Sequence, residues 1–188
     1  MPRQSDNRDR ILGTAYQLFY ERGFSRISMD AVAARAGITK RTLYNHFDSK
    51  DRLFGEMLKR QSTLAVARIK TWATQQGGSA EDFVATIFER LAAWSAKKRW
   101  EGSGFTRLAL ELADLPGHPG RTAARRHKAM IERVFADELR RRGLKRPEEA
   151  ARALQILTEG ATILTLIHGD SAYVGTAAEA ARAVLKGN

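Results

Sequence analysis

The sequence predicts an all-α fold in which three short N-terminal helices are joined by one long helix to a larger helical body. Apolar residues recur every three or four positions along most of the 188 residues, as they do on one face of a helix. Glycine, proline and capping residues separate these segments. No strand-like alternation and no internal repeat stands out, so we expect helices throughout.

The three N-terminal helices are delimited by residues that start or stop helices. Gly23 follows the first apolar segment and is a natural C-terminal stop. Ser28 is a good N-cap for the second segment, "MDAVAARA". Gly37 breaks that helix, and Thr39 caps a third helix whose inward residues are Leu43 and Phe47.

A long helix is expected next. Asp48 or Ser49 opens it, and it runs to the glycine pair at 77–78. At about 1.5 Å per residue this rod is about 40 Å long, enough to bridge two domains.

Five more helices are expected in the body. The capping box "SAED" at 79–82 opens the first of them, and "LPGHPG" at 115–120 cannot continue any helix. The first of the five begins at Ser79, and the second contains "FTRLALELA". The third ends at Gly143, the fourth runs from Pro147 to His168, and the fifth spans roughly Thr176 to Lys186.

Composition excludes several classes of protein. The chain has no cysteine, which excludes a disulfide scaffold, thiol catalysis and zinc ribbons. The N-terminus "MPRQSDNRDR" has no signal-peptide core behind it, and no apolar run approaches the roughly 20 residues of a membrane span. We therefore expect a cytoplasmic protein without a membrane partner.

The charge indicates a polyanionic partner. The formal net charge is +11 at pH 7. The densest basic run, Arg121 to Arg146, has ten Lys/Arg and three Asp/Glu residues. A solvated helix face explains such a run more often than a binding site does. Charge thus supports a nucleic-acid partner without locating the surface that meets it, and whether this run has a function is left open.

Three residues near Gly37 have the spacing of a helix-turn-helix. Two helices that cross closely need a small residue at the crossing, a turn residue that tolerates left-handed geometry, and an apolar anchor on the second helix. Ala33, Gly37 and Leu43 meet these needs. An ordinary helical hairpin with a polar surface is the alternative.

With Leu43 inward, the polar residues of the third helix project outward. Arginine can bind guanine O6 and N7, asparagine can read adenine, and threonine can contact a thymine methyl. Tyrosine, histidine, serine and lysine at the edges are better placed for phosphates. The candidate DNA-binding residues are Ser28, Thr39, Lys40, Arg41, Thr42, Tyr44, Asn45, His46 and Lys50.

Lys50 raises a question of its own. It lies in a first helical turn, where the positive end of the macrodipole disfavours a cation. An external phosphate would supply the missing negative charge.

The segment "SMDAVAARAGITKRTLYNHFDSKDRLF" resembles the signature of TetR-type bacterial transcriptional regulators, over roughly residues 8–55. Leu43-Tyr44, Phe47 and Ser49-Lys50 all fall in register. The resemblance implies a homodimer with two DNA-binding heads, a larger domain that encloses a small-molecule pocket, and final helices that pair across the dimer axis. It also implies that Tyr44 and Lys50 touch phosphates.

We therefore expect a ligand-responsive, sequence-specific regulator, more a repressor than an activator, acting on a palindromic operator. Residues 1–50 would form the helix-turn-helix DNA-binding domain, and residues 51–188 the ligand-binding and dimerisation domain. The effector, the operator sequence and the regulated genes cannot be named from the sequence.

Two further groups of residues are candidates for the body's functions. Apolar and a few polar side chains are candidates for the ligand pocket, although each alone is more often plain core: Phe88, Trp94, Phe105, Glu111, Leu112, Met130, Phe135 and Thr162. The helix from Pro147 is apolar on most faces, so one face needs a partner. The predicted dimer interface is Leu157, Leu164, Ile167, Ala177, Ala181, Val184 and Leu185.

Other classes of function are less well supported. The four histidines are scattered, and no metal-ligand spacing, phosphate loop or nucleophile–base pair is found, so no cofactor, metal or catalysis is expected. The rival interpretations are an all-helical enzyme or small-molecule carrier, and a nucleoid-type protein that binds DNA without sequence preference. Base-reading side chains at Arg41 and Asn45 argue against the last.

Overall fold

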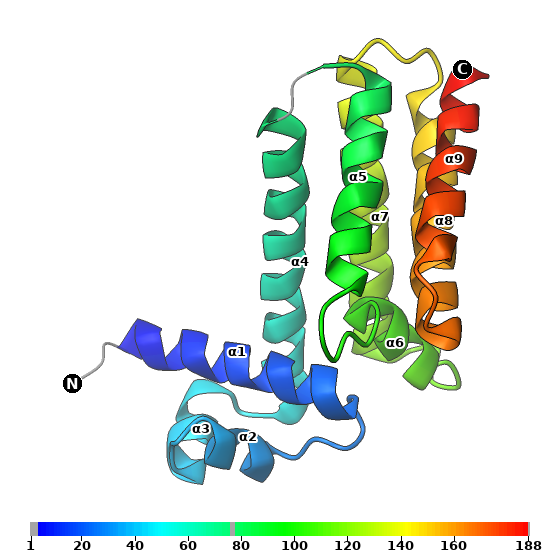
Figure 1. The fold of residues 1–188 in the computed structure, drawn as a ribbon. Helices are drawn as coiled ribbons and strands as arrows, with labels where there is room; N and C mark the ends of the chain where they lie inside the picture. Colours follow the sequence, from blue (N-terminus) through cyan, green and yellow to red (C-terminus); the bar gives the residue numbers. More distant parts are fainter. Residues whose placement is uncertain (1–3, 76–77, 188) are drawn as a thin grey trace. The chain divides into compact units, whose positions relative to one another are not determined.

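The computed structural model describes residues 4–75 and 78–187. Within those residues the chain forms nine α-helices and no β-strand, so the predicted all-α class is confirmed (Figure 1). The helices are α1 (Gln4–Arg22), α2 (Met29–Arg35), α3 (Lys40–His46), α4 (Lys50–Gln75), α5 (Ala80–Ser95), α6 (Gly104–Glu111), α7 (Pro119–Arg141), α8 (Pro147–His168) and α9 (Ala172–Lys186).

The predicted capping residues start these helices. The side chain of Ser28 accepts a hydrogen bond from the backbone of Ala31 and caps α2, and the side chain of Thr39 caps α3 in the same way. Ser49, one of the two predicted openers of α4, accepts from the backbone N–H of Arg52 at 3.1 Å. The capping box at Ser79 is formed in full.

The last helix begins earlier than predicted. The sequence indicated a start near Thr176, whereas α9 starts at Ala172. The carboxylate of Asp170 accepts from the backbone N–H of Ala172 at 2.8 Å, and the ring of Tyr173 stacks on that of His168, with 5.1 Å between centroids. These contacts order a first turn that the alanine pattern alone does not mark.

The chain folds into two compact units. The first unit comprises Met1–Leu64 and Gly104–Arg126, and the second comprises Ala65–Ser103 and His127–Asn188. The first part of α4 and the whole of α6 thus belong to the same unit as the N-terminal helices. The predicted division at residue 50 concerns function and stays a prediction.

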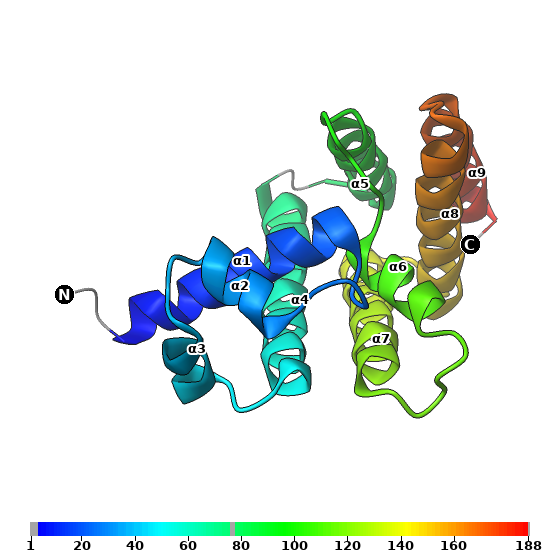
Figure 2. The same ribbon diagram turned by 90° about the horizontal axis from the view of Figure 1, so that it is seen from below.

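The first unit buries one apolar core. Helix α1 contacts α2, and α2 contacts α3, as Figure 2 shows from below. The ring of Phe54 on α4 meets those of Phe19 and Phe24 edge-on, with centroids 6.2 and 4.6 Å apart. The core also includes Ile11, Leu18, Val32, Leu43, Phe47, Leu53, Met57 and Leu108.

The second unit is a bundle in which α5, α8 and α9 pack against one another (Figure 1). Its core includes Phe83, Val84, Ile87, Phe88, Phe135, Leu139, Leu154, Ala161, Val174 and Leu185. Among the described helices α8 alone is long and apolar enough to cross a membrane by length and composition. In the structure it packs against α5 and α9, and 39% of its apolar stretch is buried.

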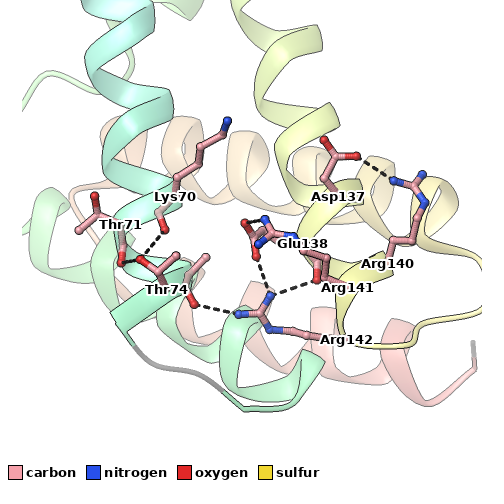
Figure 3. Close-up of polar contacts among 9 residues, drawn as sticks. Lys70, Thr71, Thr74, Asp137, Glu138, Arg140, Arg141 and Arg142 are labelled. Atoms are coloured by element: carbon pink, nitrogen blue, oxygen red, sulfur yellow. Dashed lines mark hydrogen bonds and ion pairs between the residues drawn. The ribbon is translucent and has the colours of Figure 1, made fainter.

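A buried ion-pair network holds the end of α7 against the end of α4 (Figure 3). The carboxylate of Glu138, with a side chain 2% exposed, pairs with Arg141 and Arg142. The Arg142 guanidinium also donates to the backbone carbonyl of Ala73 at 3.0 Å and lies 5.0 Å from the centroid of the Phe83 ring. This network positions the end of the helix that begins at Lys50.

Candidate nucleic-acid interface

The turn between α2 and α3 is built by the residues that the sequence indicated. Gly37 has φ +63°, a left-handed conformation that glycine adopts without a steric penalty. The backbone N–H of Ile38 donates to the carbonyl of Ala33 at 3.1 Å, and that of Gly37 to Ala34 at 3.2 Å, which is a Schellman motif. Ala33 and Leu43 are both buried. The predicted helix-turn-helix is therefore present.

One side of α3 is exposed while Leu43 fills the core. Arg41 and Asn45 are exposed, and Tyr44 between them is 43% exposed. Within the part of the chain that the structure describes, neither Arg41 nor Asn45 makes a side-chain hydrogen bond or ion pair. Their polar groups are free to meet an external partner.

The N-terminal end of α3 carries three ordered polar side chains. The hydroxyl of Thr39 accepts from the backbone N–H of Thr42 at 3.1 Å, and the two hydroxyls lie 2.8 Å apart. The ammonium of Lys40 lies 2.9 Å from the carboxylate of Asp30, whose hydrogen bond and charge raise the pKa of Lys40. Both partners of this pair are mostly exposed, and such pairs contribute little to stability, so the ammonium can exchange Asp30 for another anion.

Lys50 lies half-buried at the start of α4 and has partners within the chain. Its Nζ donates to the backbone carbonyl of Phe24 at 3.0 Å and lies 4.5 Å from the Phe24 ring centroid and 5.7 Å from that of Phe54. Burial lowers the pKa of Lys50, while the charges of Asp51 and Glu111 act in the opposite direction. The Lys50 ammonium is therefore stabilised by a carbonyl and two aromatic rings in addition to the unfavourable effect of the helix dipole.

The remaining two candidates lie at the edges of the motif. Ser28 is exposed, and because its oxygen accepts from Ala31 at 3.1 Å, its own hydroxyl proton remains available to donate. His46 ends α3 and is half-buried. Its backbone carbonyl accepts from Arg8 at 3.3 Å, and the Arg8 guanidinium lies 4.7 Å from the Phe47 ring centroid. Arg8 thus connects α1 to the C-terminal end of α3.

Glu111 has a role that the sequence did not indicate. Its carboxylate accepts from the backbone N–H groups of Phe24 and Ser25, at 2.8 and 2.7 Å, in the loop between α1 and α2. Desolvation opposes its charge, but these bonds, chiefly that from Ser25, and the charge of Arg107 keep the pKa of Glu111 below its usual value. The place of Glu111 among the predicted ligand-pocket residues does not account for this contact. No local sequence signal links residues 24 and 111.

The other ligand-pocket candidates are divided between the two units. Phe105, Glu111 and Leu112 belong to the first unit, where Phe105 and Leu112 are buried in the core and Glu111 is exposed. Phe88, Trp94, Met130, Phe135 and Thr162 belong to the second. Phe88 and Phe135 are core residues there, while Met130 is 45% exposed. The Thr162 hydroxyl donates to the backbone carbonyl of Thr158 at 2.7 Å. The pocket stays a prediction.

A groove of about 340 Å³ lies in the second unit, beside the network of Figure 3. None of the predicted pocket residues lines it. The lining is mostly charged and comes from α4 and α7: Lys70, Val134, Asp137, Glu138, Arg140 and Arg141. In the part of the chain that the structure describes, no group of three or more His, Cys, Asp or Glu side chains has the arrangement of a metal site.

The predicted dimer-interface residues also differ in exposure. Ala177, Ala181 and Leu185 are buried in the core of the second unit, which leaves them little surface for a partner. Leu157 and Val184 are partly buried against the same core. Leu164 and Ile167 are exposed, and they share α8 with the exposed Ile156 and Leu166. The interface stays a prediction, and the exposed part of α8 is the surface that is open to a second copy.

The geometry of α2 and α3 defines a helix-turn-helix protein with an exposed, polar second helix. Residues 11–57 match the model of bacterial regulatory proteins of the tetR family. This N-terminal stretch of the chain is therefore similar to that of tetR-family regulators.

Curated relatives match about a third of the chain. The transcriptional activator FasR of Mycolicibacterium smegmatis is 36% identical over 70 residues, which cover 37% of this chain and 32% of FasR. The transcriptional regulator UidR of Escherichia coli K12 is 38% identical over 63 residues, which cover 34% of this chain and 32% of UidR. The match thus spans about a third of the length of each relative.

Solved structures match nearly the whole chain. A TetR-family transcriptional regulator from Streptomyces coelicolor is 26% identical with a TM-score of 0.84, over 97% of this chain and 96% of that one. The reduced form of NemR from E. coli is 21% identical with a TM-score of 0.86, over 94% and 95% of the two chains. The second likeness concerns the fold alone.

Proposed function

We propose that this protein is a sequence-specific DNA-binding transcriptional regulator that reads its operator with α3. The observation that carries the proposal is the exposed face of α3, where Arg41 and Asn45 have free polar ends over a packed helix-turn-helix. Arginine and asparagine are the side chains best suited to bidentate contacts with guanine and adenine in the major groove. The relatives' names, all of helix-turn-helix regulators, support the same class.

The remaining polar residues of the motif would hold DNA phosphates. Tyr44, His46, Ser28 and Lys50 flank the reading face, and Thr39, Lys40 and Thr42 lie at the end of α3 that enters the groove. The net charge of +11 favours association with a polyanion. Such a regulator acts in the cytoplasm, where the bacterial chromosome lies.

The proposed active species is a homodimer that represses from a near-palindromic operator. The exposed apolar side chains of α8, including Leu164 and Ile167, support a partner surface on that helix. A two-fold dimer requires half-sites about one helical turn apart, or a small multiple of it.

A small-molecule effector is proposed to bind the second unit. Four polar atoms there are buried without a hydrogen-bond partner among the described residues, and two of them are the donor Trp100 Nε1 and the acceptor Gln155 Oε1. Buried polar atoms are normally paired, so a ligand that satisfies this donor and this acceptor would gain affinity from both. If the effector releases DNA, effector and operator must weaken each other's binding by the same factor.

Selection from a pool of random DNA duplexes tests the function. We expect enrichment of one near-palindromic motif by the wild-type chain and no enrichment by a variant carrying both Arg41→Ala and Asn45→Ala. If the wild type enriches no motif, the nucleoid-type or enzymatic alternatives take precedence.

A further inference from the structure

The loop between α1 and α2 offers two successive backbone N–H groups to one carboxylate. Gly23 has φ +81°, and this left-handed residue turns the N–H groups of Phe24 and Ser25 toward Glu111 Oε2 and Oε1, at 2.8 and 2.7 Å. A Cβ atom at position 23 would lie 3.1 Å from Oε2. Successive N–H groups next to a left-handed residue form an anion-binding nest, and hydrogen bonds to a charged acceptor are stronger than neutral ones. Glu111 fills this nest.

The same loop is held from its other side by Lys50. The peptide group between Phe24 and Ser25 donates its N–H to Glu111 at 2.7 Å and accepts from Lys50 Nζ at 3.0 Å through its carbonyl. One peptide therefore connects the carboxylate to the ammonium. Hydrogen bonds in such a chain polarise and strengthen one another. The ring of Phe24, 4.5 Å from Nζ, fixes the ammonium from a second direction.

We propose that Glu111 is a positioning residue for DNA binding, which acts through the Phe24–Ser25 peptide to hold the Lys50 ammonium ready for a phosphate. This inference rests on the proposed function, because it requires Lys50 to contact DNA. An ammonium can donate three hydrogen bonds, and the Phe24 carbonyl accepts one of them. The other two are left for a phosphate oxygen and solvent.

The sign of the effect separates positioning from simple electrostatics. Glu111 carries a negative charge, so if it acted only through its field, its removal would strengthen binding to every DNA sequence. If it positions Lys50, its removal weakens binding although the protein becomes more positive. The Glu111→Gln variant keeps the size of the side chain, but its NH₂ group cannot accept a hydrogen bond from the loop. One of the two backbone N–H groups then loses its acceptor.

The experiment measures the operator Kd of four purified full-length proteins between 50 and 300 mM salt: wild type, Glu111→Gln, Lys50→Ala and the double variant. Asp114→Asn is the matched control, because Asp114 is an exposed carboxylate of the same unit with no hydrogen bond or ion pair to a described residue. Circular dichroism melts verify that each protein is folded at the assay temperature. Glu111→Asp, which keeps the charge but shortens the reach, is measured alongside in case the glutamine variant does not fold.

We expect Glu111→Gln to raise the operator Kd about tenfold near 150 mM salt and to lower the salt slope by about two units per dimer, as Lys50→Ala does. In the Lys50→Ala background the second substitution should change Kd by less than about twofold, since both act on one contact. Asp114→Asn should bind as tightly as wild type or more tightly. Glu111→Asp should fall between wild type and the glutamine variant.

Three results would overturn the inference. The first is a Glu111→Gln protein that keeps the wild-type salt slope, or binds no more weakly than Asp114→Asn. The second is a loss that persists undiminished when Lys50 is already alanine. The third is a wild type that binds no operator, which would overturn the proposed function with it, whereas the first two leave that function standing.

Discussion

The Glu138 network should contribute more to stability than any surface ion pair of the chain, and the substitution Glu138→Ala tests this. The Arg142 side chain is only 10% exposed, and its guanidinium lies 2.7 Å from Glu138 Oε2. Without the carboxylate this cation stays buried with only backbone carbonyls, those of Glu138 at 3.1 Å and Ala73 at 3.0 Å, as acceptors. Removal of one partner of a buried pair costs about 3–5 kcal/mol.

The carbonyls that remain place the expected loss near the lower limit, at about 3 kcal/mol. For a chain of this length that loss lowers Tm by about 6–12 °C. Tryptophan fluorescence follows the unfolding of the second unit selectively, because the three tryptophans of the chain, Trp72, Trp94 and Trp100, all belong to it. Far-UV circular dichroism follows the whole chain.

Two variants sharpen the experiment. Arg140→Ala removes a cation whose partners Asp137 and Glu148 are more than half exposed, so its Tm should stay close to that of wild type. Replacement of both partners, Glu138→Leu with Arg142→Met, should recover most of the loss, because no unpaired charge is then buried. The reasoning is refuted if Glu138→Ala and Arg140→Ala have the same Tm, or if the double replacement is no more stable than Glu138→Ala.

Three further predictions follow from single sites. Burial, aided by the charge of Lys128, lowers the pKa of His127 to about 4. Between about pH 6.5 and 4 the imidazole is therefore neutral in the folded protein but protonated in the unfolded chain. Stability should therefore fall by up to about 3 kcal/mol as pH drops from 6.5 to 4, and His127→Gln should flatten that decline in urea titrations at several pH values. Leu164→Glu or Ile167→Glu should yield monomers by light scattering at micromolar concentration, whereas Met130→Glu, at an exposed position of α7, should not; dimers in both α8 variants would place the interface elsewhere. Lys50→Ala should lower the free energy of unfolding by about 1 kcal/mol, because the lost bond to Phe24 outweighs relief of the helix dipole; a more stable variant would mean that the dipole dominates.

The helix-turn-helix was predictable because its determinants are local. Ala33, Gly37 and Leu43 lie within eleven positions, and each has a distinct steric requirement that a residue type reveals. The caps at Ser28 and Thr39 depend only on the backbone three residues away. Fold class and the exposed face of α3 follow from the same short-range pattern.

Contacts between distant segments were not predictable. Glu111 meets Phe24 and Ser25 across more than 80 positions, and nothing near residue 111 marks a partner there. The helix dipole alone predicts that Lys50 destabilises the folded protein. Its contacts with the carbonyl and the ring of Phe24 reverse that sign, so that Lys50 is expected to stabilise it. Apolar periodicity also cannot tell which face of a helix the chain itself covers: Ala177 and Ala181, residues of the predicted interface, lie in the core of the second unit.

The most direct test of the central claim compares base reading with general affinity. The affinities of wild type and Asn45→Ala are measured for the selected operator and for a scrambled duplex, with Gln17→Ala, an exposed amide on α1, as the matched control. We expect Asn45→Ala to lose about 1–3 kcal/mol on the operator, to relax preference at one base position per half-site, and to change binding to the scrambled duplex little. Equal losses on both duplexes, or an Asn45→Ala protein that binds the operator as tightly as Gln17→Ala, would contradict sequence recognition by Asn45 on α3.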